Sequence, residues 1–285
     1  MAPSATAGGE GRKTGRDGSF AYLVPALLLV TLFFIVPVLM LLIRSVLEPE
    51  PGLGNYAALL GSTTYLRIFV NTFVVAGVVT AISVLIGYPV AWLLAIMPEK
   101  WSRLVLAVVI LSMWTNLLAR TYAWMVLLQR TGVINKTLIG LGLIDTPLPL
   151  VNNLVGVTIG MVYIMLPFVI LPLMGVIRAI DPAVLRAAAL CGATKRQCFT
   201  RVLLPLSLPG IAAGALMVFV MSLGYFVTPA LLGGTSNMML AELVAQFVQS
   251  LVNWGMGGAA ALVLLVVTLA LYAVQLRYLH VNGGR

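Results

Sequence analysis

Long runs of apolar residues dominate the sequence, and they limit what the chain can fold into. A helix needs roughly 20 mostly apolar residues to cross the hydrocarbon layer of a bilayer. Runs of at least that length occupy residues 20–43, 68–97, 104–128, 155–177, 208–232 and 256–276. Only 9% of the residues are charged, whereas a soluble domain carries roughly 25%. The sequence therefore predicts an all-α polytopic membrane protein with six transmembrane helices.

The excess of positive charge predicts an orientation in the membrane rather than a nucleic-acid partner. The net charge is +9, and the cations lie in short gaps between the apolar runs, where they would face anionic lipid. With the N-terminus in the cytoplasm, the cytoplasmic cations are Arg12, Lys13, Arg16, Lys100, Arg103, Arg178, Arg186, Lys195, Arg196, Arg201, Arg277 and Arg285. The outer cations are then Arg44, Arg67, Arg120, Arg130 and Lys136. Twelve against five favours both termini inside.

Two regions stand apart from the spans. Residues 1–19 are rich in Gly, Ser and Arg and are expected to form a disordered basic tail, which leaves 20–285 as one six-span domain. Within that domain, residues 179–206 form a long cytoplasmic loop. The two cysteines and the single His280 match no metal-binding or disulfide pattern, so neither catalytic nor metal-binding residues are expected in this chain.

The long cytoplasmic loop predicts a helix–turn–helix. Asp181 followed by Pro182 is a typical helix start, with the Asp as N-cap. Gly192 can adopt the left-handed conformation that ends such a helix. Thr194 and Gln197, three residues apart, form a capping box for the second helix. From the residues alone, two uses of this hairpin remain open, namely docking into a groove on another protein and lying on the lipid surface.

The same loop resembles the EAA loop of permease subunits in binding-protein-dependent ABC importers. That pattern is Glu-Ala-Ala, three residues, Gly, nine residues, Ile, one residue and Leu-Pro, and this chain meets its spacing throughout. Arg186 stands where the family usually has Glu, and this puts the charge pairing at that corner in doubt. The coupling residues that the resemblance implies are Arg186, Ala187, Ala188, Gly192, Ala193, Phe199, Val202, Leu204 and Pro205.

Three further stretches are similar to the spermidine/putrescine-type permeases within this family: LLARTYAWMVLLQRTGVIN, LPLVNN and YFVTPALLGG. The resemblance implies a multi-pass subunit of the bacterial inner membrane, surrounded by lipid. It also implies a periplasmic binding protein, a second and non-identical permease subunit, and two cytoplasmic ATP-binding subunits. The chain has no GxxxxGK[ST] loop, so ATP and Mg²⁺ are expected in the partner ATPase and no cofactor in this chain.

Four residues are candidates for the translocation pathway, and each has an ordinary alternative. Arg120 lies in the third run, where it either gates the pathway or extends to the outer headgroups. Ser222 and Tyr225 either line the pathway or pack inside the bundle. Glu242 begins the amphipathic stretch AELVAQFVQSLVNW and either contacts the substrate or binding protein or is simply solvated.

Other functions agree less well with the sequence. An importer of the same class for another small solute remains an alternative, because related permeases share the stretches quoted above. An ion-coupled secondary transporter usually has acids at the centre of its spans and internal repeats, and neither is evident here. A membrane enzyme would need clustered His, Asp, Glu or Cys.

Overall fold

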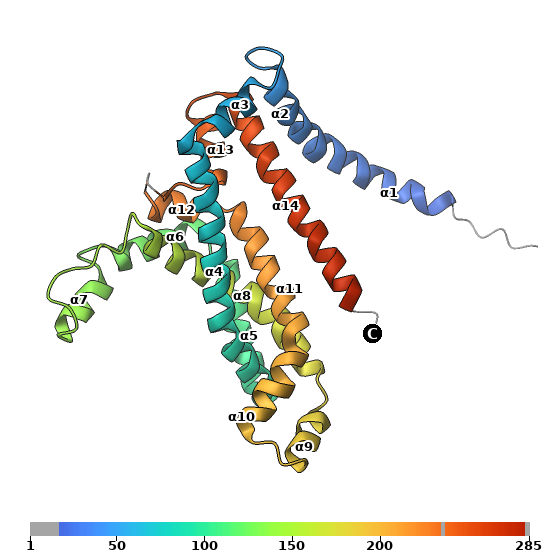
Figure 1. Cartoon of the computed structure of the whole chain (residues 1–285), viewed down its shortest axis with the longest axis vertical. Coiled ribbons are helices and arrows are strands. Elements are labelled where there is room, and N and C mark those ends of the chain that lie inside the picture. Colours follow the sequence, from blue (N-terminus) through green and yellow to red (C-terminus); the bar gives the residue numbers. More distant parts are fainter. Residues whose placement is uncertain (1–16, 235–236, 283–285) are drawn as a thin grey trace, which may run out of the picture.

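The structure is a computed structural model that describes residues 17–234 and 237–282, and all regular elements in these two ranges are helical (Figure 1). The residues expected to form a disordered tail lie almost wholly outside these ranges. The elements are α1 (Asp17–Val30), η1 (Thr31–Ile35), α2 (Val36–Leu47), α3 (Gly54–Gly61), α4 (Thr63–Ile96), α5 (Glu99–Trp114), α6 (Leu117–Leu128), α7 (Val133–Gly140), α8 (Leu154–Ala179), α9 (Pro182–Leu190), α10 (Lys195–Gln197), η2 (Cys198–Leu203), α11 (Leu204–Leu223), α12 (Val227–Leu232), α13 (Leu240–Gln249) and α14 (Trp254–Asn282).

Within the described ranges, five continuous helical stretches are long and apolar enough to cross a membrane. They are 24–47, 63–96, 154–179, 195–223 and 254–273. A sixth crossing exists if α5 and the segment 117–140 count as one span, because these two are bent by 98° relative to each other. The predicted membrane architecture is therefore confirmed, and the third span is the unusual one.

Two of the predicted span boundaries are wrong. The third apolar run was expected to form one helix over 104–128, but α5 ends at Trp114 and Asn116 caps a new helix by accepting bonds from the amides of Leu118 and Ala119. The fifth was expected over 208–232, but its helix ends at Leu223. A bend at residues 224–226 then leads into the short α12. Composition does not reveal such breaks, because the residues on both sides remain apolar.

Helix α8 is the centre of the bundle and packs mainly against α4 and α11. Its buried side chains include Met161, Met165, Val169 and Leu173, none of them accessible to solvent. Glycines on the neighbouring helices allow a close approach. A Cβ on Gly214 of α11 would lie only 3.2 Å from the Cα of Val169. Small residues at helix contacts are the usual way to pack helices in lipid, where apolar surface alone provides no driving force between helices.

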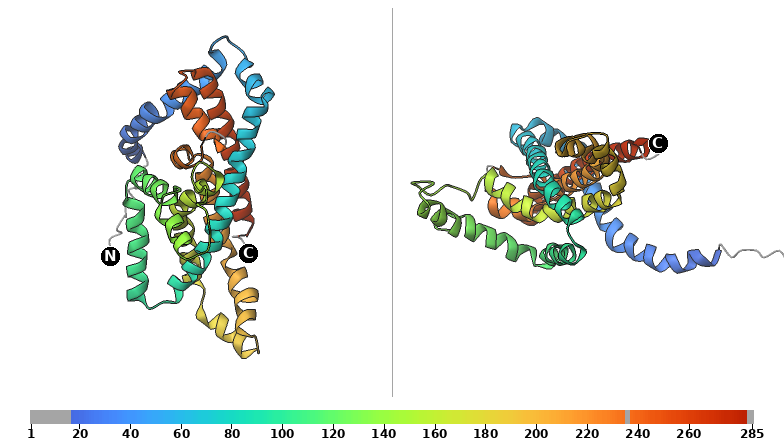
Figure 2. Two further views of the ribbon diagram at one scale, coloured as in Figure 1. Left: turned by 90° about the vertical axis from the view of Figure 1, so that its left-hand side faces the viewer. Right: turned by 90° about the horizontal axis from the view of Figure 1, so that it is seen from below.

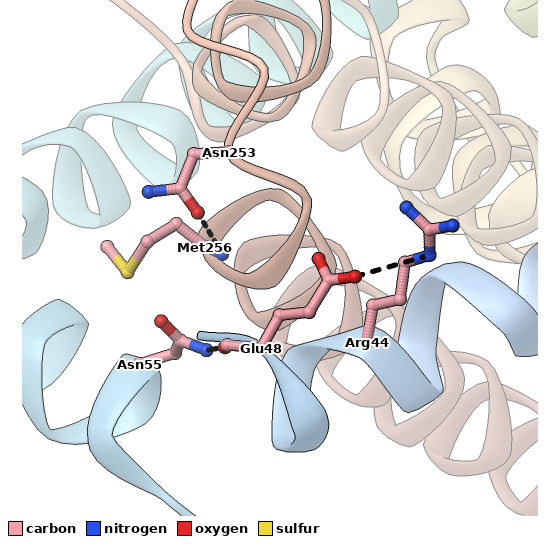
Figure 3. Close-up of polar contacts among 5 residues, drawn as sticks. All are labelled: Arg44, Glu48, Asn55, Asn253 and Met256. Atoms are coloured by element: carbon pink, nitrogen blue, oxygen red, sulfur yellow. Dashed lines mark hydrogen bonds and ion pairs between the residues drawn. The ribbon is translucent and has the colours of Figure 1, made fainter. Parts of the chain in front are cut away.

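Polar contacts join the end of α2 to the starts of α3 and α14 (Figure 3). The Asn55 amide donates to the carbonyl oxygens of Ser45 at 2.9 Å and Glu48 at 2.6 Å. The Glu48 carboxylate lies 3.7 Å from the Arg44 guanidinium, which also sits 5.3 Å from the centre of the Trp254 ring. These contacts fix the corner where the N-terminal helices leave the bundle.

Two parts of the chain extend away from the bundle on different sides (Figures 1 and 2). One is the N-terminal arm, made of α1, η1 and α2. None of the side chains in its most apolar window is buried, and Phe33 is 73% exposed. The other is formed by α6 and α7, which leave the bundle laterally after the 98° bend. Apolar surfaces of this extent in one chain indicate contact with lipid or with another protein.

Candidate functional site

The hairpin of residues 181–205, for which the sequence predicts a coupling role, lies at the opposite end of the bundle from α3 and α13 (Figure 1). Its predicted caps are confirmed. The Asp181 carboxylate accepts from the Ala183 amide at 2.8 Å, and Gly192 has a φ of +85°. Thr194 and Gln197 form the reciprocal capping box, with the Thr194 amide donating to the Gln197 side chain at 2.8 Å. Local sequence thus determines the shape of this hairpin.

One face of α9 is fully open. Leu190 is 90% exposed, more than any other large apolar side chain in the described ranges. Arg186 and Ala187, one turn earlier on the same face, are also exposed. An exposed leucine at the tip of a rigid hairpin has the shape and chemistry of an anchor for a pocket on a partner. The sequence pattern did not identify Leu190, since it falls among the three unspecified positions before Gly192.

The other side of the hairpin rests on the bundle through aromatic rings. Phe199 packs against Tyr88 with ring centres 5.8 Å apart and against Trp92 at 5.4 Å. An apolar pocket of about 490 Å³ remains between the two arms of the hairpin and α4, and Ala193 and Phe199 are among its lining residues. Val202, Leu204 and Pro205 lie where the hairpin joins α11, and Leu204 packs against the main core.

Arg178 fastens the base of the hairpin. It lies at the end of α8, three residues before the Asp181 cap. Its guanidinium donates to the Leu94 carbonyl at 3.2 Å and to the buried Ser102 hydroxyl. Ser102 itself donates to the same carbonyl at 2.7 Å. The ends of α4, α5 and α8 are thereby joined at the point where the chain enters the hairpin.

The structure brings two of the four pathway candidates together. Arg120 in α6 lies close enough to Tyr225 to act electrostatically on its hydroxyl, and Tyr225 also lies beside Thr228 of α12. The neighbouring Thr121 is buried, and its hydroxyl lies 3.3 Å from that of Thr228. Both helix breaks, at 115–116 and at 224–226, therefore meet around Arg120.

Of the other two pathway candidates, Ser222 adjoins this pair, because its carbonyl oxygen accepts from the Tyr225 amide at 3.3 Å, whereas Glu242 lies in a different helix. Ser222 is fully buried near the end of α11, and the described residues offer its hydroxyl no hydrogen-bond partner. Glu242 is in α13, which packs against α14 through a face that includes Leu243 and Phe247. One oxygen of its carboxylate is buried without a hydrogen-bond partner in the described part of the chain, and burial raises the pKa of this carboxyl group.

The bundle has an exposed hairpin at one end and unpaired polar groups near the helix breaks. These features are typical of multi-pass transport proteins that contact other subunits. Residues 82–280 match the family described as "Binding-protein-dependent transport system inner membrane component". The chain belongs to this family and is thus an inner-membrane protein.

Proteins of known function agree with this family over most of the chain. The spermidine/putrescine transport system permease protein PotB of Salmonella typhimurium (strain SL1344) is 35% identical over 246 residues, which cover 84% of this chain and 85% of that protein. PotB of Haemophilus influenzae is 38% identical over 224 residues, 78% of each chain. One chain of a bacterial alginate ABC transporter superposes with a TM-score of 0.74 at 19% identity, covering 90% of this chain and 92% of its own.

Proposed function

We propose that this chain is a permease subunit of an ATP-driven importer for polyamines such as spermidine and putrescine. The observation that supports this most directly is the identity of 35–38% with spermidine/putrescine permeases over most of the chain. The absence of a nucleotide-binding loop from the sequence agrees with ATP and Mg²⁺ being bound by separate subunits. The importer would therefore comprise this chain, a second and non-identical permease, two ATPases and a periplasmic binding protein.

In this proposal the coupling hairpin contacts an ATPase in the cytoplasm, and both chain termini lie on that side. The exposed face of α9 supports the docking role, because its apolar tip and its cation at Arg186 are both free to meet a partner. Phe199 and the base contacts of Arg178 would carry movement of the hairpin into α4, α5 and α8. The helix breaks around Arg120 and Tyr225, together with Ser222 and Glu242, would lie along the outer part of the pathway.

The function is tested by reconstituting the complete transporter in liposomes with its binding protein and following radiolabelled spermidine. We expect uptake that requires ATP on the side of the membrane that carries the ATPase subunits. Uptake should stop when the binding protein is omitted. A matched preparation without the ATPase subunits is the control. ATP-independent uptake, or uptake of an unrelated solute in preference to spermidine and putrescine, would contradict the proposal.

Glu242 allows a sharper test of the outer pathway. A half-buried carboxylate with an unpaired oxygen is suited to bind an ammonium group, so Glu242→Gln should lower spermidine uptake about tenfold, as expected for loss of one charge-assisted hydrogen bond. Gln is nearly isosteric with Glu, and the variant should keep the contacts of Leu243 and Phe247 in α13. The measurement is initial uptake at subsaturating spermidine, with Asp145→Asn, which removes the same charge at an exposed carboxylate in a loop, as control.

The pH dependence of the protein's stability distinguishes a substrate-binding role of Glu242 from a structural role. Because burial raises the pKa of Glu242 in the folded protein, its contribution to stability is fully present below its unfolded pKa and falls as pH rises through the folded pKa. Glu242→Gln should remove this fall, so the variant should be at least as stable as wild type at neutral pH while transporting less. Thermal unfolding from about pH 4 to pH 8 measures this. A variant that loses both stability and uptake would indicate a structural role.

A further inference from the structure

Arg120 carries a charge that the described part of the chain leaves unpaired. Its Nε is buried, and residues 17–234 and 237–282 offer it no hydrogen-bond partner. The two ion pairs found in these ranges, Arg44–Glu48 and Arg103–Glu99, involve other arginines. An arginine cannot escape this situation by losing its proton, because its guanidinium stays charged in proteins. The side chain as a whole is half-buried. A partly buried cation without a counter-charge is still costly, so a counter-charge is expected in the assembled protein.

The surroundings of Arg120 favour protein over lipid as the source of that counter-charge. Tyr225, beside Arg120, belongs to the break at residues 224–226, whose flanking Phe226 is 40% exposed. Irregular backbone at membrane depth is tolerated only where protein or a water-filled cavity covers it. The contact between Thr121 and Thr228 holds α6 against α12 at this point. Arg120 is thus held beside a partly exposed stretch of irregular backbone.

This chain itself has few acids to offer. The acidic residues that the structure describes outside the N-terminal turn of α1 lie at helix ends or in loops, away from the centres of the spans. They are Glu48, Glu50, Glu99, Asp145, Asp181 and Glu242. Of these, Glu48 and Glu99 are already paired, and Asp181 caps α9. The charge of the whole chain is +9, so a complementary acidic group is more readily supplied from outside it.

The geometry points to an ion pair between Arg120 and an acidic side chain of the second permease subunit, beside the translocation pathway. A polycationic substrate would compete with Arg120 for the same carboxylate and thereby weaken the contact between the subunits at the helix breaks. The contact would act as a gate that a cation opens. This second step rests on the proposed function, whereas the ion pair does not depend on which solute is carried.

The test uses the complete transporter in liposomes and begins with ATP hydrolysis in the absence of the binding protein. Loss of the ion pair should favour the open arrangement, so Arg120→Gln and Arg120→Glu should raise this basal hydrolysis about tenfold, within the usual range of coupling between sites. Arg120→Lys keeps the charge and should raise basal hydrolysis less than Arg120→Gln does. The control is Arg130→Gln, which alters an exposed arginine just after the same helix. Unchanged basal hydrolysis in Arg120→Glu would overturn the proposal.

A charge exchange identifies the partner. Each acid in the membrane segments of the second subunit is replaced by Arg in the Arg120→Glu background, and one replacement should restore basal hydrolysis to the wild-type level. If none does, the proposal is wrong. An effect of Arg120→Gln that appears only in vesicles containing anionic phosphatidylglycerol, and not in zwitterionic phosphatidylcholine, would then assign Arg120 to an anionic lipid headgroup. The competition step has its own measurement. Added spermidine should raise basal hydrolysis in wild type but not in Arg120→Gln. If the wild-type transporter carries another solute in preference to spermidine, the proposed function is wrong. The charge-exchange result would still test the ion pair, because that pair does not depend on the solute.

Discussion

Replacing Leu190 by Asp is expected to uncouple the permease from its ATPase almost completely. Leu190 is 90% exposed at the tip of α9, and nothing in the described bundle depends on it. Burial in a partner's pocket is the simplest use for such a side chain, and anchors of this kind contribute about 2 kcal/mol or more to binding, roughly a 30-fold change in affinity. Placing a carboxylate in that pocket should cost at least as much, because the charge would be desolvated.

The measurement is the amount of ATPase that co-purifies with the permease, followed by spermidine-stimulated ATP hydrolysis. Leu190→Met should retain both, since Met is of similar size and apolar character. The matched control is Leu53→Asp, which introduces the same charge at a leucine that is 69% exposed near the opposite end of the molecule. Full retention of the ATPase by Leu190→Asp would mean that the open face of α9 is not the docking surface.

A second large effect is expected at Gly258, where a single added methyl group should loosen the N-terminal arm. A Cβ at this position of α14 would overlap the carbonyl oxygen of Leu41 in α2 and lie 3.1 Å from the Cβ of Ser45. The clash involves backbone and cannot be relieved by a change of rotamer, so the two helices must separate. Overpacking of this kind costs about 1–3 kcal/mol, and Gly258→Ala should lower the stability of the protein accordingly.

The matched control is Gly77→Ala in α4, where the new Cβ would meet nothing within 4 Å. Since alanine restricts the unfolded chain more than glycine does, this variant should be neutral or slightly stabilised. Thermal unfolding of both variants in detergent provides the comparison. Equal stability of the two would show that α2 and α14 are not held as closely as the structure indicates.

Membrane architecture was largely predictable from sequence, because the length of an apolar run is set directly by the thickness of the bilayer. The hairpin was equally predictable, since Asp181, Gly192 and the Thr194–Gln197 box are short-range signals that act within one turn of helix. The breaks were not predicted. Asn116 does cap α6, but a single asparagine inside a long apolar run gives little warning of a 98° bend.

The sequence identified the candidate pathway residues by their type, but it did not predict which of them lie close together. Arg120 and Tyr225 were candidates because polar groups in spans are rare, and only the fold reveals that two separate helix breaks bring them together. Leu190 was missed for the opposite reason. A leucine at the end of an alanine-rich helix looks like a core residue until the structure shows that no core lies beside it.

The segment from Lys195 to Leu223 is one continuous helical stretch of 29 residues, made of α10, the π-helical η2 and α11. At 1.5 Å per residue such a stretch is about 43 Å long. One end carries the capping box of the hairpin, and the other ends at the break that holds Tyr225. The hairpin and the outer break are thus connected by helix alone, without an intervening loop. A tilt of the inner end would reach the outer end through this helix, with bending expected at the π-helical stretch and at Pro209.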